Sequence, residues 1–105
     1  MEKWILTPSV RREITLELIR RGRTQREISQ ILKVTEAAIS QYKNAKRGKA
    51  YQFSDTEMSW IQDTATKIDR EPSSALQEVT KVVDKIQQNE SSWGLRSRRA
   101  SIAEG

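Results

Sequence analysis

Apolar residues recur every three or four positions along most of the chain, which is the spacing of helices that bury one side. The first such stripe, Val10, Ile14 and Leu18, predicts a helix over residues 8–21. Thr7 is expected to cap its start, Pro8 fits its first turn, and Gly22 is a natural stop. Residues 1–7 are expected to form a short N-terminal arm.

Two short helices are predicted next, each with its own N-cap. Thr24 and Glu27 form a capping box, in which each side chain satisfies a backbone amide at the start of the helix. This helix is expected to end near Leu32. Thr35 follows closely as the cap of a third helix that runs to about Asn44.

The C-terminal half repeats the helical pattern twice. A capping box at Ser54 precedes a helix over residues 55–70, and Pro72 separates it from a helix over residues 73–88. The two apolar stripes are Met58, Ile61, Ala65 and Ile68, then Leu76, Val79, Val83 and Ile86. Residues 90–105 lose this periodicity and are expected to form a disordered basic tail. No segment alternates long enough to make a strand, so the fold class predicted is all-α, with about five helices.

The two short helices and the turn between them have the features of a helix-turn-helix unit. In such a unit the apolar residues of the first helix and the turn, Ile28, Leu32 and Val34, meet Ile39 and Tyr42 of the second. Ser29 is the small residue expected where the two helix axes cross. A crossing of roughly 90 to 120° leaves one side of the second helix free. That side carries Thr35, Glu36, Ala37, Ser40, Gln41 and Asn44.

The stretch from Leu18 to Gly48 reads LIRRGRTQREISQILKVTEAAISQYKNAKRG. It resembles the helix-turn-helix of Cro/C1-type transcriptional regulators and is most similar to the archaeal branch of that family. The resemblance is carried by Thr24, Gln25, Glu27, Ile28, Thr35, Ala37, Ala38, Ile39, Ser40, Gln41, Tyr42, Lys46, Arg47 and Gly48. It implies that residues 35–44 are the recognition helix, that Gln25 and the basic residues after this helix hold the DNA backbone, and that the protein binds operator DNA as a dimer.

Two positions depart from the family pattern. Lys33 stands where the turn usually has glycine, and Asn44-Ala45 stands where Ser-Gly is common. If Lys33 adopts a positive φ, the strain is on the order of 1 to 2 kcal/mol. The second departure predicts that the recognition helix runs one residue longer than usual.

Positive charge is concentrated in the N-terminal half. The chain has 19 Lys and Arg against 14 Asp and Glu, a net charge of +5. Residues 1–48 hold eleven basic and five acidic side chains and so carry +6, whereas residues 49–89 carry −2. This distribution favours an anionic partner that docks on the N-terminal half, with nucleic acid first. The alternative is an ordinary solvated helix face made by Arg11, Arg12, Arg20, Arg21 and Arg23.

The composition also excludes much chemistry. The chain has no His and no Cys, which removes the usual zinc sites, imidazole acid–base catalysis, thiol nucleophiles and disulfides. Gly48-Lys49 is not the end of a phosphate-binding loop, because Ala50 stands where Ser or Thr is needed. We therefore expect no enzyme, no catalytic residue, no metal and no cofactor. No apolar run approaches the ~20 residues that span a bilayer, so a cytoplasmic, nucleoid-associated protein without a membrane partner is expected.

The expected partner is double-stranded DNA, with residues 35–44 in the major groove. The residues predicted to contact bases are Thr35, Glu36, Ala37, Ser40 and Gln41, whose side chains are short or planar. The residues predicted to contact phosphates are Gln25, Lys43, Asn44, Lys46 and Arg47. The alternative for the polar residues is that they only face water. The sequence does not identify an effector ligand.

The C-terminal stripes, about two heptads each, are too short for a free-standing coiled coil. Two roles remain open for them: folding back onto the first three helices to complete a monomer, or forming the dimer contact. We expect the second, with all eight stripe residues at the interface of a homodimer that reads a palindromic site.

The predicted organisation is thus an arm (1–7), a helix-turn-helix domain (8–48), a helical pair for dimerisation (49–89) and a tail (90–105). The predicted function is a sequence-specific transcriptional regulator that acts as a repressor. Two alternatives are an architectural DNA-binding protein without sequence choice and a protein-interaction adaptor on a helix-turn-helix scaffold.

Overall fold

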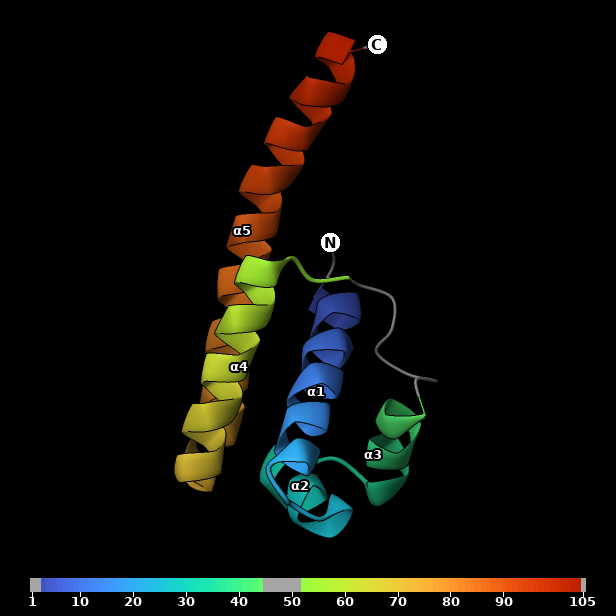
Figure 1. The fold of residues 1–105 in the computed structure, drawn as a ribbon, viewed down its shortest axis with the longest axis vertical. Coiled ribbons are helices and arrows are strands. Elements are labelled where there is room, and N and C mark those ends of the chain that lie inside the picture. Colours follow the sequence, from blue (N-terminus) through green and yellow to red (C-terminus); the bar gives the residue numbers. More distant parts are fainter. Residues whose placement is uncertain (1–2, 45–51, 105) are drawn as a thin grey trace.

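The computed structural model describes residues 3–44 and 52–104, with side chains for residues 6–44 and 52–89. In this part of the chain the structure has five α-helices, one 3₁₀ turn and no strand, which confirms the all-α prediction (Figure 1). The elements are α1 (Lys3–Arg20), α2 (Gln25–Leu32), α3 (Glu36–Lys43), α4 (Asp55–Arg70), η1 (Pro72–Ser74) and α5 (Ala75–Glu104).

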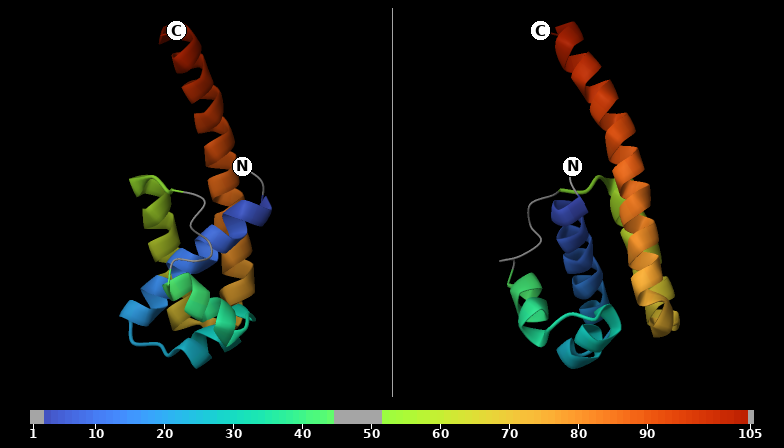
Figure 2. Two further views of the ribbon diagram at one scale, coloured as in Figure 1. Left: turned by 90° about the vertical axis from the view of Figure 1, so that its right-hand side faces the viewer. Right: turned by 180° about the vertical axis from the view of Figure 1, so that it is seen from behind.

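Helix α1 is the centre of the arrangement. It packs against the α4–α5 pair on one side and against α2 and α3 on the other, and α5 also touches α2 (Figures 1 and 2). The core is continuous across these contacts. Its largest fully buried side chains include Ile14 and Leu18 of α1, Ile39 of α3, Ile61 of α4 and Ile86 of α5.

The start of α1 differs from the prediction. The helix begins at Lys3 rather than at residue 8, so Thr7 does not cap it and Pro8 lies inside it. Leu6 explains the difference, because it lies four residues before Val10 and is as fully buried, at 0% exposure. Burial of Leu6 extends the apolar stripe by one turn, and the segment predicted as an arm becomes helix from Lys3 onward.

The end of the chain also differs from the prediction. Helix α5 continues to Glu104 instead of giving way to a disordered tail after residue 89. Its second half projects beyond the rest of the molecule (Figures 1 and 2). The segment contains no proline, and a helix already nucleated by packed residues extends with one hydrogen bond for each residue added.

The apolar stripes of α4 and α5 are used inside the chain. Six of the eight residues expected at a dimer contact are buried in the shared core: Ile61, Ala65, Ile68, Val79, Val83 and Ile86. Met58 is partly buried against that core, and only Leu76, 49% exposed, faces solvent to a large extent. The expectation of an eight-residue dimer contact was therefore wrong as stated. The stripes cover α1, which otherwise has too few neighbours to bury its own apolar side.

Glu57 links the two C-terminal helices at one end of the pair. Its Oε1 accepts the Ser54 backbone N–H at 3.0 Å, and its backbone N–H donates to the Ser54 hydroxyl at 3.2 Å, so the predicted capping box is confirmed. Its Oε2 accepts from Asn89 Nδ2 of α5 at 3.1 Å. Glu57 is only 3% exposed, and these bonds offset the loss of hydration of its carboxylate.

Thr15 of α1 carries a polar atom that the described residues leave without a partner. The residue is fully buried, and no described residue makes a hydrogen bond to its hydroxyl. We expect Thr15→Val to raise the free energy of unfolding by about 1 kcal/mol, because the isosteric methyl removes an unsatisfied buried hydroxyl. The midpoint of thermal unfolding should rise by several degrees.

Thr66→Val is the matched control. The Thr66 hydroxyl donates to the Gln62 carbonyl at 3.0 Å and accepts from Arg21 Nη2 at 2.7 Å, so its removal should not stabilise the protein. A Thr15→Val protein that melts no higher than the wild type would show that the buried hydroxyl is satisfied.

Candidate nucleic-acid interface

The turn between α2 and α3 is closed by backbone hydrogen bonds at Lys33. Lys33 has φ 58° and ψ 42°, the left-handed conformation that usually requires glycine. Its N–H and that of Val34 both donate to the Ser29 carbonyl, the second at 3.1 Å. These bonds satisfy the end of α2 and offset the strain. The turn therefore closes although lysine, and not glycine, holds the left-handed position.

Gly22 ends α1 by a related arrangement. Its φ is 95°, its N–H donates to the Ile19 carbonyl at 2.9 Å, and the Arg23 N–H donates to the Leu18 carbonyl at 3.0 Å. This pair of bonds is a Schellman motif. It reverses the chain so that Thr24 can begin α2, where the Glu27 N–H donates to the Thr24 hydroxyl at 3.1 Å.

The inner side of α3 is anchored in the core. Ala38, Ile39 and Tyr42 are at most 4% exposed, and α3 contacts both α1 and α2. The α2 residues expected to meet them, Ile28 and Leu32, are buried in the same cluster. This packing fixes the orientation of α3 about its own axis and determines which side is left to solvent.

The outer side of α3 carries the residues predicted to contact bases. Thr35, Glu36 and Ala37 are exposed, and Ser40 and Gln41 lie one turn further on, half-buried. The Thr35 hydroxyl also accepts the Ala38 N–H at 3.0 Å as the N-cap, so it retains a proton to donate outward. Thr35 is the N-cap of α3 and the other four residues belong to the helix, which lies at the edge of the molecule (Figures 1 and 2).

The residues predicted to contact phosphates are only partly described. Lys43 and Asn44 are exposed at the end of α3, and Gln25 is half-buried at the first position of α2. Asn44 is the C-cap of α3, with its N–H donating to the Ser40 and Tyr42 carbonyls. The helix thus ends at Lys43, one residue before the predicted end at about Asn44. Lys46 and Arg47 lie outside the described residues.

The arginines around α1 pair with acidic side chains. Arg12 pairs with Glu13, and Arg20 and Arg21 both pair with Glu17, at 2.8 and 3.3 Å. The two members of each pair are one to four residues apart in sequence, so these pairs are local to α1 and its end. Arg12, Arg20 and Arg21 are therefore already engaged within the chain.

Arg23 makes a longer connection that sequence reasoning missed. Its Nε donates to Asp69 Oδ1 and its Nη2 to the Asp69 carbonyl, each at 2.8 Å, and Nη1 lies 3.5 Å from Glu27 Oε2. The hydrogen bond to Asp69 raises the pKa of Arg23 above its ordinary value. The turn that precedes α2 is thereby tied to the end of α4, 46 residues away in sequence.

Comparison with models of protein families, with curated proteins and with solved structures found no match to this chain. Among the described residues, no helix is long and apolar enough to cross a membrane, and no group of three or more acidic side chains could hold a metal ion.

The capping box of α2 predicts a dependence of stability on pH. The hydrogen bond from the Thr24 backbone N–H to Glu27 Oε1, 2.9 Å long, lowers the pKa of Glu27 below its ordinary value of 4.5, and Arg23 adds to the shift. The ionised Glu27 therefore stabilises the fold fully above pH 4.5, and this contribution is lost as the pH falls through the lowered pKa.

Glu27→Gln keeps a hydrogen-bond acceptor for the capping box but removes the charge. Denaturant unfolding of both proteins between neutral and acidic pH should show the wild type as the more stable, with the difference shrinking as the pH falls below 4.5. A difference that does not change with pH would contradict this role of the carboxylate.

Proposed function

We propose that this protein is a sequence-specific double-stranded DNA-binding regulator of transcription, in which α3 enters the major groove of a half-site. The observation that carries the proposal is the division of α3 into a buried side, which fixes its orientation, and a short polar side that is open to solvent. The major groove, about 12 Å wide, admits one α-helix and presents a distinct pattern of donors and acceptors for each base pair.

The chemistry of the outer side supports base recognition. Gln41 can bond adenine through two atoms, Ser40 and Thr35 can bond several bases, and the methyl group of Ala37 can touch a thymine methyl. Glu36 can accept from cytosine N4. The core contacts of Ala38, Ile39 and Tyr42 mean that these groups reach the groove from a rigid support, which limits the entropy lost on binding.

The distribution of paired and unpaired charges is consistent with DNA bound beside α3. Arg12, Arg20, Arg21 and Arg23 pair with Glu13, Glu17, Glu27 and Asp69, whereas Lys43 at the end of α3 is exposed and has no ion pair to any described residue. Lys43 is therefore free to attract a phosphate at the end of α3. The first turn of α2, with Gln25, adds backbone amides and the positive end of a helix dipole.

Selection of bound sites from a random duplex pool is the direct test, followed by binding of Gln41→Ala to the selected site. Loss of a two-atom contact should reduce discrimination at one base position by about 1 to 3 kcal/mol and leave other positions unchanged. Gln77→Ala, at an exposed position of α5 away from α3, is the matched control and should bind like the wild type. A pool that returns no motif would favour an architectural role instead.

Lys43→Ala separates phosphate contact from base contact in the same assay. It should weaken binding to all sequences alike and reduce the slope of log K against log salt by about one. If no duplex binds in a salt-dependent way, the proposal fails, and the adaptor alternative gains support.

A further inference from the structure

Leu76 is the one large hydrophobic residue that stands exposed among the described side chains, at 49%. It lies in the first turn of α5, beside two hollows in the surface. One, about 470 Å³, lies between α2 and the start of α5, and the other, about 370 Å³, lies between α1 and α5. A single exposed leucine is ordinary on a protein surface, so what distinguishes this place is the hollow beside it and the charges at the two ends of that hollow.

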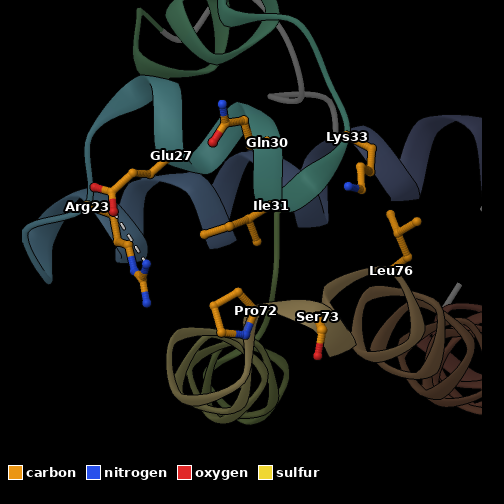
Figure 3. Close-up of a pocket in the computed structure, with 8 residues that line it drawn as sticks. All are labelled: Arg23, Glu27, Gln30, Ile31, Lys33, Pro72, Ser73 and Leu76. Carbon is orange, nitrogen blue, oxygen red and sulfur yellow. Dashed lines mark ion pairs between the residues drawn. The ribbon is translucent and has the colours of Figure 1, made fainter.

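The larger hollow, here called the Leu76 groove, has an apolar middle and two ends of opposite charge. Ile31 and Pro72 lie in the middle, with Arg23 and Glu27 at one end and Lys33 and Leu76 at the other (Figure 3). At the first end Arg23, Asp69 and Glu27 form one ion-paired group with a net charge of −1. At the other end Lys33 is exposed and has no ion pair to any described residue.

This distribution is self-complementary. A two-fold axis that lies in the contact plane and passes near Ile31 and Pro72 exchanges the two ends of the groove. Lys33 of each copy then faces Glu27 of the other, and the apolar middle of each copy faces itself. Contacts between identical surfaces are the rule for two-fold dimers, in which residue i meets j and j meets i.

We propose that the Leu76 groove is where a second copy of this chain binds, related to the first by that two-fold axis. The contact keeps Leu76 and replaces the six stripe residues that are buried in the core with a surface made by α2, Pro72 and the first turn of α5. None of the outer α3 residues lines the groove, so both copies keep α3 free. The inference deepens the proposed function by specifying the dimer, but the contact itself does not depend on DNA.

Sedimentation equilibrium of the full chain without DNA tests the proposal. The wild type should be in a monomer–dimer equilibrium, and Leu76→Glu should raise the dimer dissociation constant at least about tenfold, because it places a negative charge opposite the net-negative Arg23–Asp69–Glu27 end of the other copy. Gln77→Glu adds the same charge one residue away, outside the groove, and should dimerise like the wild type. Both positions are exposed, so circular dichroism should show unchanged folding.

Cross-linking tests the symmetry. The chain has no cysteine, and Gln30 lies midway between Glu27 and Lys33 on α2, lining the groove. Gln30→Cys should therefore form a cross-linked dimer with itself when treated with a short bifunctional thiol reagent, whereas Gln77→Cys should not.

A monomer at every concentration would overturn the proposal, as would a dimer that Leu76→Glu and Gln77→Glu leave equally intact. The outcome can be distinguished from that of the DNA proposal. If the dimer is right and DNA binding is wrong, cross-linking succeeds and no duplex binds. If DNA binding is right and the dimer contact is wrong, Leu76→Glu binds full sites and half-sites with the same affinity as the wild type.

Discussion

The apolar stripe of α1 is the constraint on which the other contacts depend. Leu6, Val10, Ile14 and Leu18 follow one another at intervals of four residues and are all fully buried. A single helix cannot bury such a stripe and its flanks alone. The α4–α5 pair covers α1 on one side, and α2 and α3 cover it on the other. Placement of α3, and with it the candidate interface, is therefore a consequence of how α1 is covered.

The same constraint links stability to the proposed function. Ile39 and Tyr42 can be buried against α1 and α2 only if α3 presents Glu36, Ala37 and Gln41 outward. The strained backbone of Lys33 and the salt bridge between Arg23 and Asp69 fix α2 on either side of this contact. A change that loosens the core would thus be expected to disturb recognition without touching an outer residue.

Local features of the fold could be predicted from the sequence because they depend on a few neighbouring residues. The caps at Thr24, Thr35 and Ser54 and the stop at Gly22 are of this kind, and the structure confirms each. Each of them satisfies backbone groups within about one turn. The members of the α3 surface followed from the same local reasoning, since the buried and exposed sides alternate with helical period.

Features that depend on distant partners could not be predicted in this way. Leu6 lies four residues before Val10, but Thr7 and Pro8 have the pattern of a helix start, so the sequence did not predict that α1 begins before them. The stripes of α4 and α5 would fit a dimer as well as a core. The pairing of Arg23 with Asp69 joins residues whose proximity only the packed helices create. The sequence places Leu76 in an apolar stripe together with buried residues of α5. Only the structure shows that Leu76 is exposed whereas most of the stripe is buried.

The most direct test of α3 as the helix that contacts DNA is an NMR titration of the labelled protein with a duplex that carries a selected site. We expect backbone amide signals from Thr35 to Asn44, and those of the first turn of α2, to shift or broaden most, whereas signals of α4 change little. Signals of α3 that stay in place while those of another face shift would contradict it.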